Sequence, residues 1–347
     1  MKTICCSLVF FLLIFFNHSA VVSGKETPPK ESSVNYDFIP PDGKVLLIVG
    51  QDRATIAKYV SATNEIPAGV MLYTSVQTVD GLEDGADYGA GVQHGKALLT
   101  AYPNSVIQIG LYLVDALDGI ISGTYDRNLQ FLARWIKKAD RPVYLRIGYE
   151  FDLPDNKYYP EKYRAAFHHI VNLLRQMNVR NVAFVWHSCI PDKPQRPWMD
   201  WYPGDDYVDW FGASVFTTGK IAGATRFLQL AREHKKPFMI AESTPQGSRL
   251  VPTKADWFKH IFRFIAEQKV EAFCYIDSNW EAMPLYKGQG WGDQRIEKEP
   301  QIKEMWLKEI NQDRYLKAST DLFASLGWET SPENSERTTP INNEKIP

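Results

Sequence analysis

The chain has 347 residues, a formal net charge of −2 at pH 7 and an aromatic content of 13%. A charge so close to zero excludes the basic footprint of a nucleic-acid-binding protein. The length is sufficient for one large domain, and the many rings suit a sugar-binding surface as well as a core.

The two ends differ in composition from the rest of the chain. Lys2 precedes a short apolar run and then small residues, which predicts a secretory signal peptide over residues 1–24; a retained N-terminal anchor is the alternative. Residues 25–41 are rich in Pro, Ser and charge, and residues 329–347 are polar, so we expect a flexible segment and a disordered tail. The folded domain is therefore predicted at residues 42–328 of a secreted or periplasmic protein.

Eight apolar runs alternate with longer amphipathic segments along this domain. The runs are rich in Val, Ile and aromatic residues nearly throughout, which is typical of parallel strands covered on both faces. The predicted strands are 44–50, 68–74, 106–114, 143–151, 182–188, 209–216, 237–243 and 270–277. The clearest helices are 125–139, 160–177, 224–236 and 254–268.

This alternation predicts a fold of class α/β, a single (β/α)8 TIM barrel. A doubly wound open sheet is the alternative. The chain lacks the glycine-rich phosphate-binding motifs that commonly accompany that fold, and this also disfavours a nucleotide as ligand.

Glutamates occupy equivalent places at the ends of the fourth and seventh predicted strands. Glu150 follows "RIGY" and Glu242 stands in "AES". Strands four and seven lie across the barrel mouth from one another, where such barrels carry their active sites. For either residue alone, a structural salt bridge is an equally good explanation, but a facing pair of carboxyl groups is the machinery of glycoside hydrolysis.

Three stretches together resemble glycoside hydrolase family 26, which belongs to the large clan of retaining barrel glycosidases. They are "RIGYEFD" (146–152), "WYPGDDYVDWFGASVF" (201–216) and "PFMIAEST" (237–244). The resemblance runs from roughly the third strand to the eighth. It implies Glu150 as the acid/base, Glu242 as the nucleophile, and a β-mannan, β-glucan or β-xylan as substrate, cleaved mostly in endo fashion.

The chain departs from this family at four positions. The family usually has His just before the acid/base and Asn two residues after it, where this chain has Tyr149 and Asp152. After strand six the family usually has Asp and a nucleophile-contacting Tyr, where this chain has Ser214 and Phe216. Because Phe216 cannot donate a hydrogen bond, another group must hold the nucleophile. We expect substrate preference to differ here, with Tyr149 and Asp152 near the substrate.

Arg146 and His187 are further candidates. Arg146 lies four residues before Glu150 on the same strand face, so it is predicted one layer below the carboxylates, where its charge would act on the nucleophile or form an inner salt bridge. His187 ends the neighbouring strand and would contact sugar hydroxyls, tune the acid or sit in the core. Alternation turns the ring of Tyr149 away from the barrel axis unless the strand bends.

Two tryptophans complete the predicted substrate-binding set. Trp280 follows the eighth strand, where a tryptophan in the resembled clan commonly forms the floor of the −1 subsite; a core position is the alternative. Trp291 stands in a Gly-rich loop, where sugar stacking and loop packing are both open.

Cysteine usage argues against a disulfide and a metal. Cys189 and Cys274 follow the signal segment, and three strands separate them around the barrel, so we expect free thiols. No Cys/His cluster has zinc spacing, and no metal or cofactor is expected.

The sequence therefore predicts a secreted retaining glycoside hydrolase that acts by double displacement on a β-linked polysaccharide, without nucleic acid, without a membrane after signal cleavage, and as a monomer. One alternative is a barrel that binds polysaccharide without cleaving it. A glutamate buried in a fixed salt bridge away from the mouth would favour that alternative. Another is a clan member from a different family that acts on an algal or acidic glycan.

Overall fold

Eight parallel strands close into a barrel within residues 37–331, the part of the chain that the computed structural model describes. The predicted signal peptide, most of the predicted flexible segment and most of the predicted tail lie outside the described residues. The barrel class predicted from the apolar runs is confirmed, and the open-sheet alternative is wrong, because the last barrel strand pairs with the first.

The barrel strands follow one another in chain order, with two short strands inserted after β2. They are β1 (Val45–Gly50), β2 (Gly69–Ser75), β5 (Val106–Tyr112), β6 (Val143–Ile147), β7 (Val182–Ser188), β8 (Trp210–Val215), β9 (Phe238–Ser243) and β10 (Ala272–Ile276). The short strands β3 (Ala86–Asp87) and β4 (Val92–Gln93) form a hairpin, and β11 (Tyr315–Leu316) pairs with the start of β1. Closure runs from Leu46 opposite Ala272 to Gly50 opposite Ile276.

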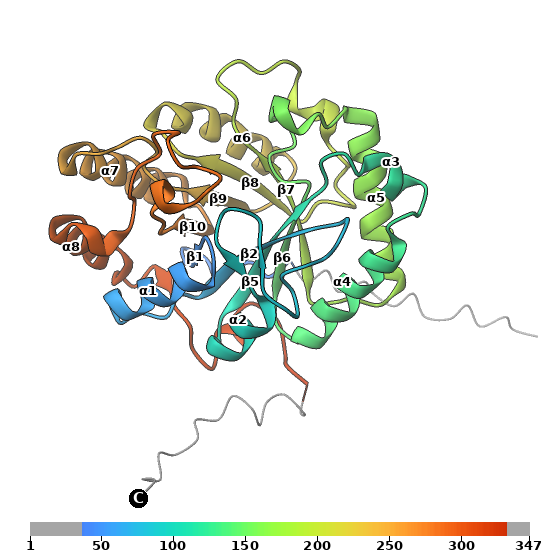
Figure 1. The fold of residues 1–347 in the computed structure, drawn as a ribbon, viewed down its shortest axis with the longest axis horizontal. Helices are drawn as coiled ribbons and strands as arrows, with labels where there is room; N and C mark the ends of the chain where they lie inside the picture. Colours follow the sequence, from blue (N-terminus) through green and yellow to red (C-terminus); the bar gives the residue numbers. More distant parts are fainter. Residues whose placement is uncertain (1–36, 332–347) are drawn as a thin grey trace, which may run out of the picture. The chain divides into compact units, whose positions relative to one another are not determined.

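Helices surround the barrel (Figure 1). They are α1 (Arg53–Thr63), α2 (Gly95–Ala101), α3 (Leu117–Ile121), α4 (Asp126–Ala139), α5 (Pro160–Gln176), α6 (Ile221–Glu233), α7 (Val251–Gln268), α8 (Pro300–Ile310) and α9 (Leu322–Ser325). Between β7 and β8 the chain forms only the short 3-10 turn η2 (Trp198–Trp201) instead of a helix. No helix among residues 37–331 is long and apolar enough to cross a membrane.

The helix ends carry the signals that the sequence predicted. Pro160 occupies the first position of α5, where its missing N–H costs nothing, and Glu161 follows in the first turn. In α4, Asp126 lies in the first turn and two lysines lie in the last. The negative charge is therefore near the positive end of the helix dipole and the positive charges are near its negative end, which stabilises the helix.

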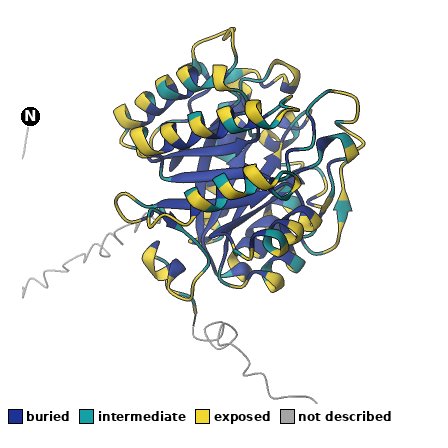
Figure 2. Cartoon of the chain, turned by 90° about the vertical axis from the view of Figure 1, so that its left-hand side faces the viewer, coloured by how far each residue is buried: buried dark blue, intermediate teal, exposed yellow. Residues whose placement is uncertain are grey.

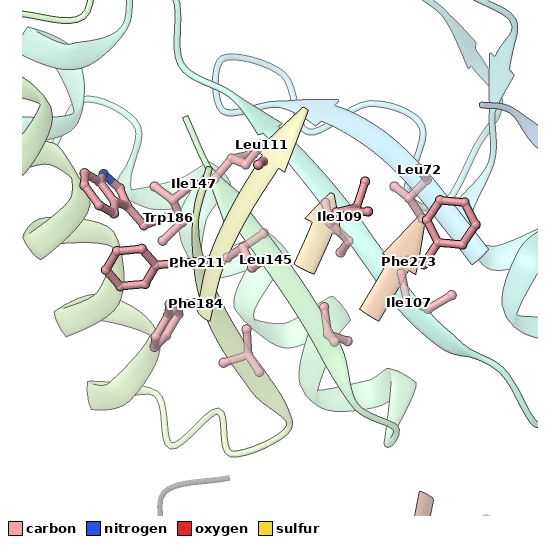
Figure 3. Close-up of a cluster of buried hydrophobic side chains, with 14 of the residues drawn as sticks. Leu72, Ile107, Ile109, Leu111, Leu145, Ile147, Phe184, Trp186, Phe211 and Phe273 are labelled. Carbon is pink, nitrogen blue, oxygen red and sulfur yellow. The ribbon is translucent and has the colours of Figure 1, made fainter. Parts of the chain in front are cut away.

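Alternation along the strands divides the core into two layers. One face of each strand packs against the helices, and Figure 3 shows part of this layer, including Leu145 and Ile147 of β6 and Phe211 of β8. The other face fills the barrel interior with residues such as Ile48 and Trp210. Figure 2 shows the result as buried strands between helices whose outer faces are exposed.

The N-terminal end of the barrel is closed by a residue outside the predicted domain. Phe38 is only 2% exposed, and its carbonyl accepts a hydrogen bond from the Tyr144 hydroxyl at 2.6 Å. The indole of Trp210 donates to the Asp37 carbonyl at 2.5 Å, and the ring of Trp328 packs edge-on to Phe38 at 6.2 Å. The folded part therefore begins before residue 42, because an apolar ring is needed to seal the interior.

We predict that Phe38→Ala lowers the free energy of unfolding by about 3–5 kcal/mol, because it opens a cavity at the end of the barrel. Chemical denaturation followed by tryptophan fluorescence measures this change. The matched control is Ile39→Ala, since Ile39 is 44% exposed and its truncation should change stability by less than about 1 kcal/mol. Equal effects of the two variants would contradict a sealing role for Phe38.

Candidate active site

The strand that carries Glu150 ends earlier than predicted. β6 stops at Ile147, and both Gly148 and Glu150 adopt left-handed backbone conformations, with φ of 54° and 53°. This conformation costs a non-glycine residue about 1–3 kcal/mol, so the residue keeps it only where its surroundings enforce it. Here the side-chain amide of Asn156 donates to the carbonyls of Tyr149 and Glu150 at 3.2 and 3.0 Å.

This turn brings the ring of Tyr149 back over the barrel axis. The Tyr149 ring lies 5.5 Å from the Tyr73 ring and 6.5 Å from the His187 ring, centroid to centroid. The guanidinium of Arg146 lies 5.1 and 5.3 Å from the Tyr73 and Tyr149 ring centroids. The bend that alternation required for an inward Tyr149 is therefore present, and two aromatic faces cover a buried cation.

Arg146 forms an ion pair with Glu242 inside the mouth of the barrel. Arg146 is fully buried and Glu242 is 7% exposed, and Nη1 of the arginine donates to Oε1 of the glutamate. Burial by itself lowers the pKa of Arg146, but the charge of Glu242 raises it above its ordinary value. Arg146 thus lies in the layer predicted from its spacing to Glu150, and it supplies the donor that Phe216 cannot.

A glycine makes room for this arginine. Gly110 of β5 pairs with Arg146 of β6 and with Tyr73 of β2. A Cβ atom at Gly110 would lie 2.9 Å from Nη2 of Arg146 and 2.5 Å from the Tyr73 ring. Glycine at this position therefore allows the close approach that the buried cation needs.

Glu150 belongs to a second polar chain that starts from the same arginine. Nη1 of Arg146 lies 3.3 Å from Nδ1 of His187, and Nε2 of His187 lies 3.0 Å from the Ser214 hydroxyl. That hydroxyl donates to Oε1 of Glu150 at 2.7 Å. The two glutamates from opposite sides of the barrel mouth are thus connected through Arg146, His187 and Ser214.

The surroundings of Glu150 favour its protonated form. Burial raises the pKa of Glu150 to about 8, and the charge of Glu242 adds to the shift, whereas the hydrogen bond from Ser214 opposes it. Burial and the charge of Arg146 lower the pKa of His187 well below its ordinary value. The site therefore combines a carboxyl group that holds its proton near neutral pH with a carboxylate paired to a cation.

The carboxylate of Asp152 forms hydrogen bonds with other groups of the protein. Its two oxygens accept from the Ser188 hydroxyl at 2.6 Å, the Cys189 amide at 2.8 Å and the Trp198 indole at 3.0 Å. These contacts tie the turn after β6 to the connection that follows β7. Asp152 was predicted near the substrate, but its carboxylate is engaged in holding these two segments together.

Four aromatic rings surround the entrance on the side of β8 and β10. Trp280 is only 2% exposed, and its ring lies 4.5 Å from Tyr286 and 4.9 Å from Trp291. The Trp291 ring also contacts Phe216 at 5.1 Å. Trp280 therefore supports the partly buried Tyr286 and Trp291, and those two rings are more accessible to a sugar than Trp280 itself.

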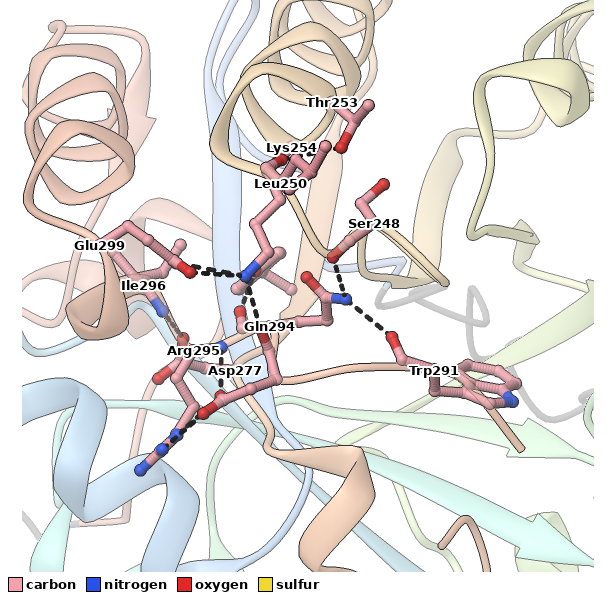
Figure 4. A network of polar contacts seen from close by, with 12 residues as sticks. Ser248, Leu250, Thr253, Lys254, Asp277, Trp291, Gln294, Arg295, Ile296 and Glu299 are labelled. Carbon is pink, nitrogen blue, oxygen red and sulfur yellow. Dashed lines mark hydrogen bonds and ion pairs between the residues drawn. The ribbon is translucent and has the colours of Figure 1, made fainter. Parts of the chain in front are cut away.

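A polar network fixes the loop that carries Trp291 (Figure 4). The Gln294 side-chain amide donates to the carbonyls of Ser248 and Trp291 at 3.0 and 2.7 Å. Lys254 Nζ binds the Asp293 carbonyl at 2.5 Å and the Glu299 carboxylate at 3.1 Å. Loop packing therefore holds Trp291 in place, and this is compatible with sugar stacking on its remaining exposed surface.

Several residues of this site were missed by sequence reasoning. Tyr73 lies in an apolar strand without a polar signal, and only its alternation with the inward-facing Met71 places it over Arg146. Tyr286 lies in a loop with no periodic pattern. Ser214 was noted for its departure from the resembled family, but its contact with Glu150 spans 64 residues of sequence and has no local signature.

Within residues 37–331, Cys189 and Cys274 are free thiols, as the separation of their strands predicted. Cys274 is fully buried in the barrel interior, where its sulfur lies 3.7 Å from Sδ of Met71. The same Met71 sulfur lies 3.1 Å from Nη2 of Arg146, so Cys274 packs in the layer beneath the ion pair.

A cavity of about 540 Å³ lies elsewhere, between the loop after β2 and helix α4. It is lined by residues of the loop from Thr78 to Ala86 and by Arg127, Phe131 and Arg134 of the helix. Neither Glu150 nor Glu242 lines it. We assign the active site to the barrel mouth, because the carboxyl groups of Glu150 and Glu242 meet there in different electrostatic surroundings.

The chain is similar in sequence to known glycoside hydrolases. The family model described as "Glycosyl hydrolase family 26" matches residues 141–282, which include Glu150 and Ser214. The beta-1,3-xylanase TXYA of a Vibrio species is 33% identical over 323 residues, which cover 84% of this chain and 70% of that protein. A beta-1,3-xylanase of an Alcaligenes species is also 33% identical, over 84% of this chain and 68% of its own length.

Solved structures share the fold at lower identity. GH26C from a Muricauda species has a TM-score of 0.62 at 16% identity, over 83% of this chain and 91% of that chain. A GH26 beta-mannanase from Bacteroides ovatus has a TM-score of 0.57 at 12% identity, over 81% of this chain and 93% of that chain.

The raised pKa of Glu150 has a consequence for stability. Between the ordinary value of 4.5 and about 8, the folded protein holds a proton on Glu150 that the unfolded chain releases, so stability falls as pH rises through this window. We predict that Glu150→Gln, which has no proton to lose, raises the melting temperature, and that the gain is larger by at least about 2 °C at pH 8 than at pH 5.

Differential scanning calorimetry at the two pH values measures this gain. Asp155→Asn is the control, because Asp155 is an exposed carboxylate on the same loop. A gain that shrinks between pH 5 and pH 8 would show that Glu150 does not hold its proton in the folded protein.

Proposed function

Because the chain belongs to glycosyl hydrolase family 26 and is a glycoside hydrolase, we propose that it cleaves a β-linked polysaccharide by double displacement, with Glu242 as nucleophile and Glu150 as acid and base. The observation that carries this assignment is the unequal environment of the two glutamates. The Arg146 guanidinium pairs with Glu242, whereas Glu150 receives a neutral hydroxyl donor and holds its proton near neutral pH.

Each step of the reaction uses a different state of these groups. The Glu242 carboxylate attacks the anomeric carbon while Glu150 transfers its proton to the leaving oxygen. Because Glu242 loses its negative charge as the new bond forms, its hydrogen bond from Nη1 of Arg146 weakens. Glu150 is then ionised and removes a proton from the water that hydrolyses the glycosyl-enzyme. The water oxygen bonds to the anomeric carbon as the bond between that carbon and Glu242 breaks, so Glu242 regains its negative charge and its ion pair with Arg146, and Glu150 is again protonated.

The substrate that we propose is a xylan with β-1,3 linkages, cut within the chain. Two proteins that are 33% identical to this one over most of its length are named beta-1,3-xylanases. The departures at Tyr149 and Ser214 from the pattern of the resembled family support a substrate other than mannan. The predicted signal segment supports action outside the cell, and we propose that the protein acts as a monomer.

The non-catalytic barrel is a weaker account of the same residues. Glu242 is indeed held in a buried salt bridge, but this bridge lies in the barrel mouth and is connected to Glu150 through His187 and Ser214. A purely structural pair would have no need of a second carboxyl group that holds its proton at the same place.

We predict that Glu242→Ala lowers kcat by at least about 10³-fold on a β-linked substrate with a good leaving group, and that azide restores much of the rate. Azide enters the space that the carboxylate left and attacks from the same face, so the product is a glycosyl azide of inverted configuration, which NMR identifies. Asp155→Ala serves as a control. Unchanged activity of Glu242→Ala would remove the nucleophile assignment.

We predict that the purified protein releases oligosaccharides from β-1,3-xylan faster than from β-1,4-xylan, β-mannan, mixed-linkage glucan or β-1,3-glucan. Product chromatography over time distinguishes the endo pattern, in which a mixture of sizes forms early. Activity on mannan without activity on β-1,3-xylan would overturn the linkage, while binding without cleavage of any glycan would favour the non-catalytic alternative.

A further inference from the structure

His187 and Ser214 occupy the space between the two glutamates without facing solvent. His187 is 0% exposed and Ser214 is 1% exposed. They come from the neighbouring strands β7 and β8, whose register sets His187 opposite Gly212. Neither side chain is accessible to a sugar hydroxyl. His187 therefore does not make the substrate contact that was one of its predicted roles, and its hydrogen-bond partners are protein groups.

The chemistry of these partners gives their hydrogen bonds one direction. A guanidinium can only donate, so Nδ1 of His187 accepts from Arg146 at 3.3 Å. A neutral imidazole has a single N–H, which must then be at Nε2 and points at the Ser214 oxygen, 3.0 Å away. The serine hydroxyl hydrogen is left for Oε1 of Glu150 at 2.7 Å.

The opposite arrangement would leave a buried donor without a partner. If Oε1 of Glu150 carried the proton, it would donate to Ser214, whose own hydroxyl hydrogen would need another acceptor. Among the described residues, the Ser214 hydroxyl has hydrogen bonds to His187 and Glu150 only. An unsatisfied buried donor is costly, so the acid's proton is excluded from Oε1.

We propose that Arg146, His187 and Ser214 form a one-way hydrogen-bond relay that keeps Oε1 of Glu150 an acceptor and thereby places the acid's proton on Oε2. This inference rests on the proposed role of Glu150. His187 and Ser214 act through Glu150 and are positioning residues. The relay also starts at the arginine that pairs with Glu242, so one buried cation orients both carboxyl groups.

The relay also acts on the second step of the reaction. The Ser214 hydroxyl stabilises the ionised form of Glu150, which is the form that serves as base. It opposes the effects of burial and of Glu242, so its removal raises the pKa of Glu150. The titratable or charged groups that act on Glu150 or sense its charge are Glu242, Asp152, Arg146, Tyr149, Tyr158, Tyr286 and Cys189.

The test measures the protonation of Glu150 in Ser214→Ala by two independent methods. The first is the alkaline limb of the pH dependence of kcat/KM on an activated aryl β-glycoside. The second is a 13C NMR titration of protein labelled at glutamate carboxyl carbons, with the Glu150 signal assigned by its absence in Glu150→Gln. We expect both to move upward by about one pH unit, because a hydrogen bond to a charged group is lost.

Three variants separate a relay from a structural effect. Ser214→Thr keeps the hydroxyl, so the alkaline limb of its kcat/KM profile should lie at the wild-type pH. His187→Leu frees the serine hydroxyl to turn away, so it should shift Glu150 in the same direction, and the double variant should shift it no further. Ser105→Ala is the control, because Ser105 is a buried serine at the opposite end of the barrel that donates to the Pro67 carbonyl at 2.8 Å.

An unchanged or lowered pKa of Glu150 in Ser214→Ala would overturn the relay, as would shifts that add in the double variant. Failure of the proposed function looks different. In that case the wild-type protein hydrolyses no glycoside, yet the NMR titration still reports whether Ser214 and His187 control the proton on Glu150.

Discussion

A guanidinium with no exposure to water stands at the centre of the barrel mouth, and the rest of the site is arranged around it. Burying a charge costs several kcal/mol unless it is paired and hydrogen-bonded. Arg146 meets this requirement through Glu242, through His187 and through the faces of two tyrosines. Glycine at position 110 leaves the space in which these groups converge.

The same cation makes two chemically identical side chains different. Glu242 contacts the guanidinium directly, whereas Glu150 contacts it only through two neutral groups. Glycoside hydrolysis with retention needs one carboxylate to attack and one carboxylic acid to donate a proton at the same pH. The asymmetry follows from the position of Arg146 on β6, four residues before one glutamate and across the barrel from the other.

The fold and the positions of both glutamates could be predicted because they depend on local patterns. Apolar runs with helices between them predict a barrel, and a carboxylate after such a run stands out at the strand end. The layer of Arg146 followed from alternation alone. Loss of alternation at Gly148 explains why the inward position of Tyr149 could only be stated as conditional on a bend.

The remaining features depend on contacts between segments far apart in sequence. Ser214 meets Glu150 across two strands, Asp152 holds the segment after β7, and Phe38 seals the opposite end of the barrel. None of these has a periodic or motif signal. Trp280 shows the same limit, since its place after β10 suits a platform, but Tyr286 and Trp291 cover it.

The most direct test of this account is to trap the covalent intermediate. A 2-deoxy-2-fluoro xyloside with a good leaving group slows the second step, so the sugar should remain bound to the nucleophile. Peptide mapping by mass spectrometry should then place one fluoroxylosyl group on Glu242, and excess β-1,3-xylo-oligosaccharide should protect against labelling. Labelling of Glu150, or turnover with an inverted product and no labelled peptide, would contradict the assignment of the two glutamates.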